Sequence, residues 1–181
     1  MNSLSDENLM VNFSEGDQRA FAELYKRHKN PLYRYFLRQL GASQHARAEE
    51  LYQDVWYRVI DKRESYTPSA KFTTWLYHIA HHLVIDEHRK NLSSDNYAKT
   101  LNDEQSDTPD MDGDKHQAIK SCMSLLAPLQ REAFLLRHEA GFEPAQICEI
   151  VGAKAEAVKT RLRYAMEQLR DCLTKKLGER Q

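Results

Sequence analysis

The stretch EPAQICEIVGAKAEAVKTRLRYAMEQLR, residues 143–170, decides the expected fold. Pro144 suits the first turn of a short helix, which Gly152 would end, and a longer basic helix would follow. The longer helix carries one apolar stripe, formed by Val158, Leu162, Ala165 and Leu169. Two helices joined by a tight turn that contains glycine, the second of them basic, are typical of a helix-turn-helix.

The side of the longer helix that faces away from this stripe is polar and basic. It carries Glu156, Thr160, Arg163 and Tyr164, with Lys159 on its shoulder. A recognition helix needs this division, because its apolar side anchors it while polar and basic side chains reach base edges and phosphates. Arg163 is expected to contact a guanine, and Lys159 a phosphate. The alternative is an ordinary amphipathic helix with a solvated basic face.

The apolar pattern outside this stretch is helical as well. Residues 128–141 form one expected helix that stops at a glycine. Residues 21–41 repeat apolar side chains at steps of three and four and end at Gly41, a candidate C-cap. Residues 46–63 divide into an apolar half and a polar half, which carries Gln53, Asp54, Tyr57 and Arg58. No strand or hairpin is indicated, so the expected fold class is all-α.

The stretch KFTTWLYHIAHHLVIDEHRK, residues 71–90, combines aromatic and basic side chains on one helix. Its core stripe consists of Phe72, Leu76, Ile79 and Leu83. A narrow band beside Trp75 is formed by Lys71, His78, His82 and Arg89. Such a face suits single-stranded or melting DNA, whose unstacked bases lie on aromatic rings while the backbone runs past cations.

Two other interpretations of residues 71–90 stay open. His78 and His82 are four residues apart and could hold zinc with a third ligand such as Asp86, although the HExxH pattern is absent. Trp75 and Tyr77 could instead be ordinary core residues. No nucleophile constellation, glycine-rich phosphate loop or carboxylate pair indicates catalysis, so the sequence predicts no enzyme, no small-molecule substrate and no cofactor.

Charge is distributed unevenly along the 181 residues, whose formal net charge is −1. Residues 91–116 carry seven acidic and two basic side chains, and they include Pro109 and Gly113 without a periodic apolar pattern. We interpret this segment as a linker between two helical domains. A solvated tether without any further role is the alternative.

The cysteines and the N-terminus bear on the compartment. Cys122, Cys148 and Cys172 form no CxxC pair, so neither a disulfide framework nor a zinc knuckle is expected. The N-terminal residues show no basic segment followed by an apolar run, so no signal peptide is expected. No apolar stretch approaches the length of a membrane span, so no membrane insertion is expected. These features predict a reducing, cytoplasmic location.

Three segments in this order carry a resemblance to a known family. AEELYQDVW, residues 48–56, is similar to an acidic pair followed by Leu-x-Gln-Glu/Asp-x-Phe, the signature of region 2.2. Residues 71–90 are similar to regions 2.3 and 2.4, where Phe-x-x-Trp-Leu-x-x-Ile-Ala and a later Asp-x-x-Arg recur. Residues 126–170 are similar to region 4. The chain therefore resembles the extracytoplasmic-function (ECF) sigma factors of the sigma-70 family, which are small two-domain bacterial transcription initiation factors.

The resemblance implies a domain division and two kinds of partner. A region 2 domain would span residues 1–92, an acidic linker residues 93–116 and a region 4 domain residues 117–181. Family members bind core RNA polymerase and promoter DNA. Region 2.2 docks on the clamp helices of the largest catalytic subunit, a contact that carries over to Glu50, Gln53, Asp54 and Arg58. The linker would thread toward the polymerase active site and the RNA exit.

The resemblance also assigns the DNA contacts. The −10 element would be contacted by Lys71, Trp75, His78, His82 and Arg89. The −35 element would be read by Lys159, Thr160, Arg163 and Tyr164, while Arg131 and Lys154 would touch phosphates. The family commonly has Asn in place of His82, so its −10 preference does not carry over. Pro144, Ala145, Gln146 and Cys148 replace a more acidic pattern in the second helix of region 4, which is expected to change backbone contacts.

Three functions compete at this stage. The first is a sigma factor that acts only with core polymerase and is controlled by an anti-sigma factor. The second is a stand-alone helix-turn-helix regulator, for which the near-neutral net charge is unusual because neutralised phosphates supply most of the affinity for DNA. The third is a metal-dependent enzyme centred on His78, His81, His82 and Asp86.

Overall fold

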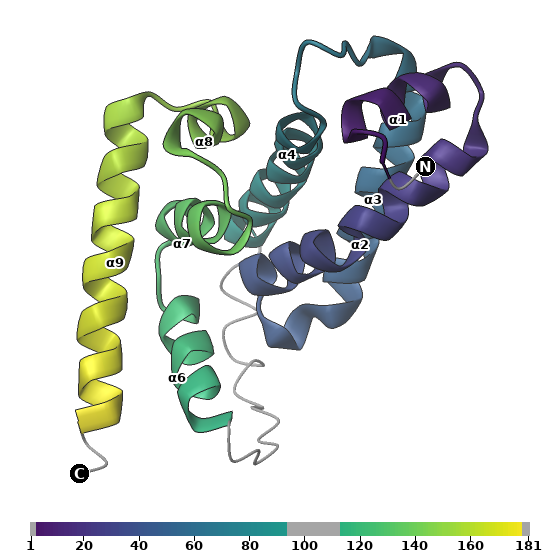
Figure 1. The fold of residues 1–181 in the computed structure, drawn as a ribbon. Helices are drawn as coiled ribbons and strands as arrows, with labels where there is room; N and C mark the ends of the chain where they lie inside the picture. The colour runs from purple at the N-terminus through teal and green to yellow at the C-terminus, as the bar shows by residue number, and fades with distance from the viewer. Residues whose placement is uncertain (1–2, 94–112, 179–181) are drawn as a thin grey trace.

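The computed structural model describes residues 3–93 and 113–178, and every regular element in these two ranges is a helix. The N-terminal helices are α1 (Asp6–Ser14), α2 (Gln18–Leu40), α3 (His45–Asp61) and α4 (Phe72–Ser93) (Figure 1). The C-terminal helices are α6 (Gly113–Ser124), α7 (Pro128–Phe134), α8 (Pro144–Val151) and α9 (Ala155–Gly178). Short turns lie at Ala42–Gln44, Arg63–Ser65 and Leu135–Glu139. The expected all-α fold class is confirmed.

The ends of α2 follow from local chemistry. The side chain of Asp17 precedes the helix and accepts a hydrogen bond from the backbone N–H of Arg19 at 3.0 Å. Gly41 follows the helix with φ 101°, a conformation that favours glycine, and its N–H donates to the carbonyl oxygen of Leu37 at 2.8 Å. The expected C-cap is therefore confirmed.

Two helices were not predicted. Helix α1 begins after Ser5, whose hydroxyl accepts a hydrogen bond from the N–H of Asn8, and it buries Leu9, Met10 and Phe13. Helix α6 begins at Gly113, so the last four residues of the expected linker, 113–116, are helical. The remainder of that linker after Ser93 lies outside the described residues.

The expected helix over residues 128–141 has two parts. Helix α7 is a regular α-helix as far as Phe134 and continues as a π-helical turn over Leu135–Glu139. Gly141 has φ 81° and follows this turn, as expected from the sequence. None of the helices within residues 3–93 and 113–178 has the length and apolarity that crossing a bilayer requires.

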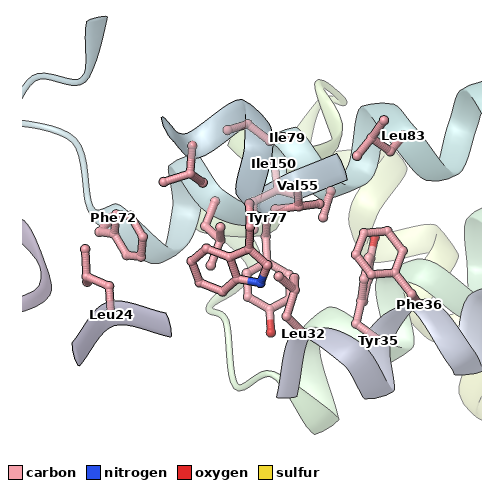
Figure 2. Packing of buried hydrophobic residues seen from close by; sticks show 14 of the residues in the cluster. Leu24, Leu32, Tyr35, Phe36, Val55, Phe72, Tyr77, Ile79, Leu83 and Ile150 are labelled. Carbon is pink, nitrogen blue, oxygen red and sulfur yellow. The ribbon is translucent and has the colours of Figure 1, made fainter. Parts of the chain in front are cut away.

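Helix α4 lies at the centre of the molecule. It contacts α1, α2 and α3 on one side and α8 on another. One buried apolar cluster therefore includes residues of α1–α4 together with Leu136, Phe142, Ile147, Ile150 and Val158. Figure 2 shows Ile150 of α8 among labelled side chains of the N-terminal helices. The N-terminal and C-terminal helices thus share a core.

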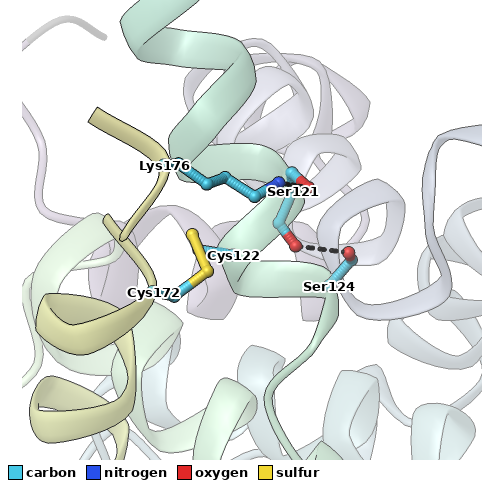
Figure 3. Close-up of a disulfide and its surroundings, with 5 residues drawn as sticks. All are labelled: Ser121, Cys122, Ser124, Cys172 and Lys176. Atoms are coloured by element: carbon cyan, nitrogen blue, oxygen red, sulfur yellow. Dashed lines mark hydrogen bonds between the residues drawn. A yellow bond between two sulfur atoms is a disulfide. The ribbon is translucent and has the colours of Figure 1, made fainter. Parts of the chain in front are cut away.

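A second, smaller cluster joins α6, α7 and α9, and a disulfide crosses it. Cys122 of α6 and Cys172 of α9 are bonded, with their Cα atoms 5.8 Å apart (Figure 3). Beside this bond, the ammonium of Lys176 donates a hydrogen bond to the hydroxyl of Ser121. The expectation of no disulfide is therefore wrong, and the reducing location that was inferred from it loses this support. The two cysteines are 50 residues apart, and only the packing of α6 along α9 brings them together.

The disulfide predicts a loss of stability on reduction. Closing a loop of about 50 residues restricts the unfolded chain, so Cys172→Ser should lower the free energy of unfolding by about 2–4 kcal/mol. Urea denaturation followed by circular dichroism, with and without reductant, measures this change. Cys148→Ser is the matched control, because Cys148 is a free, half-buried thiol, and its cost should stay below about 1 kcal/mol. Wild-type stability that does not respond to reductant would contradict the prediction.

Candidate nucleic-acid and polymerase-binding surfaces

The helix-turn-helix is held by caps at both ends of α8. Before the helix, Glu143 and Gln146 form a capping box in which the N–H of Glu143 donates to Oε1 of Gln146 at 2.9 Å. After it, Gly152 adopts the left-handed conformation at φ 67°, and its N–H donates to the carbonyl of Cys148 at 2.9 Å. Ile147 and Ile150 are fully buried and anchor the helix. The predicted turn between α8 and α9 is thus present.

Helix α9 presents the expected division of faces. Val158, Ala165 and Leu169 are buried and Leu162 is half-buried, as the stripe predicted. On the opposite side the exposed residues are Glu156, Lys159, Arg163 and Tyr164, and Lys154 is exposed just before the helix begins. The guanidinium of Arg163 lies over the ring of Tyr164, 5.4 Å from its centroid, which pre-positions both side chains. Thr160 differs from the expectation, because it is half-buried at the border of this face.

Arg131, which was expected to touch a DNA phosphate, contacts the N-terminal helices instead. Its Nη2 donates to the carbonyl oxygen of Gln39 at 2.9 Å, in the last turn of α2. Burial lowers the pKa of its guanidinium. In this arrangement Arg131 caps the carboxyl end of α2, where a cation is favourable, and it does not join the exposed face of α9.

The exposed band of α4 contains Lys71, His78, His82 and Arg89, as predicted. Trp75 is half-buried, with its ring 5.2 Å from that of Tyr66 and 6.0 Å from that of Phe72. One part of the indole therefore packs in the core, and the remainder is accessible beside the basic band. Tyr77, in contrast, is a core residue.

The two histidines of this band contact each other and the C-terminal helices. Nδ1 of His78 lies 2.9 Å from the carbonyl oxygen of Ile150, and since a carbonyl can only accept, Nδ1 carries the proton. Nε2 of His78 lies 3.1 Å from Nε2 of His82. Burial, followed by the charges of His78 and His81, lowers the pKa of His82. His82 is therefore uncharged at neutral pH, whereas Lys71 and Arg89 carry permanent positive charges in the band.

The zinc interpretation receives no support from the described part of the chain. Within it, no group of three or more His, Cys, Asp or Glu side chains is arranged to hold a metal ion. The pair of His78 and His82 has no third ligand among these residues.

A groove connects the end of α4 with α7 and α9. Its volume is about 450 Å³, and its lining includes Ile85, Arg89, Leu92, Leu129 and Arg161. Arg161 was not singled out from the sequence, because on the helical wheel it lies between the apolar stripe and the polar face. The structure thus places a cation of α9 and a cation of α4 at one groove.

The polar half of α3 is accessible. Glu50, Gln53 and Asp54 are exposed and Arg58 is half-buried. Tyr57 also belongs to this surface, because it lies on the polar half of the helix and 65% of it is exposed, although it was not among the residues expected to bind polymerase. Arg47 forms ion pairs at one edge of this surface. Its Nη1 lies 2.5 Å from Oε2 of Glu50, and its Nη2 lies 2.7 Å from Oε2 of Glu87 in α4.

Comparisons with known proteins agree with this architecture. The family model for sigma-70 region 2 matches residues 24–93, and that for sigma-70 region 4 matches residues 116–169. Together they cover more than half of the chain. Similar curated proteins include the ECF RNA polymerase sigma factor SigK of Mycobacterium sp. (strain KMS), which is 29% identical over 91% of this chain and 89% of its own. SigK of Mycobacterium tuberculosis (strain ATCC 25618 / H37Rv) is 29% identical over 87% of both chains.

Solved structures share the fold. CnrH in complex with the cytosolic domain of CnrY is 20% identical, with a TM-score of 0.71 over 94% of this chain and 97% of that chain. The sigma factor RpoE in complex with the anti-sigma factor NepR from Bartonella quintana is 22% identical, with a TM-score of 0.69 over 85% and 96%. With both sigma-70 regions matched in order and a helix-turn-helix beside an aromatic and basic α4, the chain belongs to the sigma-70 family as an ECF sigma factor.

Proposed function

We propose that this sigma factor binds core RNA polymerase through the exposed half of α3 and contacts the promoter with two separate faces. The band of α4 would contact the −10 element, and the exposed face of α9 the −35 element. The observation that carries the proposal is that both family matches cover helices whose expected contact residues are mostly exposed. The division into residues 1–92, 93–116 and 117–181 is part of this proposal, except that residues 113–116 belong to α6 and therefore to the C-terminal helices.

The chemistry of each face supports its role. On α3, the exposed carboxylates of Glu50 and Asp54 flank an accessible Tyr57, a combination that suits a protein partner. On α4, the accessible side of Trp75 offers a platform for an unstacked base, while Lys71 and Arg89 neutralise phosphates. His82, uncharged at neutral pH, can donate or accept one hydrogen bond.

The face of α9 suits duplex DNA. Arg163 and Tyr164 are exposed and held against each other, so less side-chain entropy is lost when they bind. Lys159 on the helix and Lys154 just before it are exposed and can reach phosphates. Arg131 could contribute a phosphate contact only after it has left the carbonyl of Gln39.

Regulation and location complete the proposal. Two proteins of this fold were solved in complexes, one with the cytosolic domain of CnrY and one with the anti-sigma factor NepR. We therefore propose that an anti-sigma factor controls this chain by covering its polymerase-binding and DNA-binding faces. The protein would act in the cytoplasm, without enzymatic activity of its own and without a cofactor.

Run-off transcription tests the function directly. Bacterial core polymerase is incubated with a library of candidate promoters, with and without the protein. We expect transcripts only when the protein is present, from sites that share two spaced elements. Tight DNA binding by the protein alone, without transcription, would support a stand-alone regulator instead.

Asp54→Lys should weaken binding to core polymerase. The substitution reverses an exposed charge on α3, and exposed charges at an interface act mainly on association. Fluorescence anisotropy of labelled protein with core polymerase measures the affinity. Glu15→Lys is a control with the same charge change at an exposed position outside α3. Normal polymerase binding by the folded Asp54→Lys variant would reject the α3 assignment.

Trp75→Ala should impair promoter opening more than polymerase binding, because it removes the ring on which an unstacked base would lie. Permanganate footprinting of the open complex measures promoter opening, and fluorescence anisotropy measures polymerase binding. Trp75→Phe is the matched control, since it keeps an aromatic face and should retain much of the opening. A variant that loses only polymerase affinity would show that this face does not touch melted DNA.

Arg163→Ala should cost about 1–3 kcal/mol of promoter binding and relax the sequence preference at one −35 position. Run-off transcription on templates with every base at each −35 position measures both effects. Arg170→Ala removes an exposed arginine two turns further along α9 and should leave the preference unchanged. A uniform loss across all templates would make Arg163 a phosphate contact.

A further inference from the structure

The first turn of α4 receives no cap from its own sequence. The N–H of Phe72, the first residue of the helix, is one of the groups at a helix start that find no partner within the helix. Lys71 precedes it, and the ammonium of Lys71 can only donate. The first turn holds no acidic residue either. Because Phe72 is fully buried, water does not supply the missing acceptor.

Glu7 of α1 supplies the acceptor from 65 positions away. Its Oε1 accepts a hydrogen bond from the N–H of Phe72 at 3.1 Å. A carboxylate is favourable at this place, because the N-terminal end of a helix carries a partial positive charge. Glu7 therefore acts on α4 as an N-cap side chain normally acts on its own helix.

Helix α1 is itself anchored to α2, so Glu7 extends from a fixed support. The carboxylate of Asp6 accepts a hydrogen bond from Nη1 of Arg27 at 3.1 Å and lies 2.9 Å from Nε2 of His28. Nη1 of Arg27 also donates to the carbonyl oxygen of Leu4 at 2.8 Å. The hydrogen bond with His28 outweighs burial and lowers the pKa of Asp6, so this carboxylate stays ionised at neutral pH and keeps its contacts.

The segment that leads into α4 is tied to the same end of the helix. Residues 67–71 are exposed, whereas Tyr66 before them is buried. The hydroxyl of Tyr66 donates to the carbonyl oxygen of Ala70 at 2.6 Å, and its ring lies 5.2 Å from that of Trp75. Burial, reinforced by the carboxylates of α1, raises the pKa of Tyr66 to about 12, so the hydroxyl keeps its proton and donates. Lys71 and the ring of Trp75 therefore share one ordered platform.

This platform carries two residues that the proposed function needs, because Lys71 would meet a phosphate and Trp75 an unstacked base. A contact surface that is already ordered loses less entropy on binding. We propose that Glu7 is a positioning residue for the −10 contact, whose carboxylate holds the first turn of α4 in the orientation that melted DNA requires. Glu7 acts through Lys71 and Trp75 and does not touch the DNA itself. The inference rests on the proposed function in taking this face of α4 as DNA-binding, and it concerns a helix that precedes residue 24, where the sigma-70 region 2 match begins.

Two variants of Glu7 separate the hydrogen bond from the packing. Glu7→Met keeps a side chain of similar length and removes the acceptor, whereas Glu7→Gln keeps an acceptor oxygen. Met, Gln and Glu have similar helix propensities, so neither variant should unfold α1 by itself. Glu23→Ala is the matched control, because Glu23 is also half-buried and forms an ion pair with Arg27 at 3.1 Å within α2.

Amide hydrogen exchange of the full chain, followed by NMR, tests the cap without reference to DNA. Glu7→Met should raise the exchange rate of the Phe72 N–H about tenfold, the factor that corresponds to the loss of one hydrogen bond to a charged group. Glu7→Gln and Glu23→Ala should stay close to the wild-type rate. A wild-type exchange rate in folded Glu7→Met would overturn the cap and the proposal with it.

Promoter opening by the polymerase complex tests the positioning. Glu7→Met should lower opening, measured by permanganate footprinting, by about threefold to tenfold, the cost of ordering one large side chain on binding. The affinity for core polymerase, measured by fluorescence anisotropy, should not change, and Glu7→Gln should restore opening. Unchanged opening, or an equal loss of opening and of polymerase affinity, would overturn the positioning role.

A double-mutant cycle shows whether Glu7 acts through Trp75. Once the ring has been removed by Trp75→Ala, the additional change Glu7→Met should reduce promoter opening little further, because the group that it positions is absent. Glu23→Ala in the same background should have no effect on opening. Losses that multiply fully in the double variant would contradict the proposal.

The remaining outcomes also decide. If circular dichroism shows that Glu7→Met is unfolded, Glu7→Ala takes its place, because it removes the acceptor and leaves less bulk to accommodate. Failure of the wild type in run-off transcription would refute the proposed function and, with it, the role of Glu7 at the −10 element. The exchange rate of the Phe72 N–H would still show whether Glu7 holds the first turn of α4.

Discussion

Helix α4 must bury apolar side chains on most of its circumference, and the rest of the structure depends on how it does so. Helices α1, α2 and α3 cover one side of it, and α8 covers another. A helix that is apolar on most sides is stable only when it is surrounded. The accessible band that contains Lys71, His78, His82 and Arg89 is what this packing leaves uncovered. The same helix therefore organises the core and, in the proposed function, the −10 contact.

The sequence predicted those parts of the structure that depend on local periodicity and on caps. The apolar stripe of α9, the glycine turn after α8 and the glycine that ends α2 all follow from rules that act within a few residues. The exposed positions of α3 and α4 were predicted for the same reason, since a helical wheel separates an outward face from a buried one. The role of each side chain toward polymerase or DNA rests on the family, because exposure alone does not identify a partner.

Features that join distant segments could not be predicted in this way. Glu132 resembles any acidic residue on an amphipathic helix until α7 is placed against Tyr35 and His81, which lie 97 and 51 positions away. Arg131 had the charge of a phosphate contact, but the packing directs it to the end of α2. The wide sequence spacing of the cysteines predicted no disulfide. Spacing along the chain did not decide this, because the packing of α6 on α9 brings Cys122 next to Cys172. In each case the local sequence was interpreted correctly, but the partner of the residue lies on a distant segment that only the tertiary packing brings into contact.

The disulfide between α6 and α9 has a mechanical consequence. Helix α6 is the first element of the C-terminal helices after the segment that connects them to α4, so any force transmitted along that segment reaches them through α6. A helix of 12 residues held only by side-chain packing could peel away under such a load. Because Cys122 is bonded to Cys172, the load passes through a covalent bond into the last turns of α9. The two ends of the C-terminal helices are thereby clamped to each other, at a point of α9 that lies beyond the exposed residues Lys159, Arg163 and Tyr164.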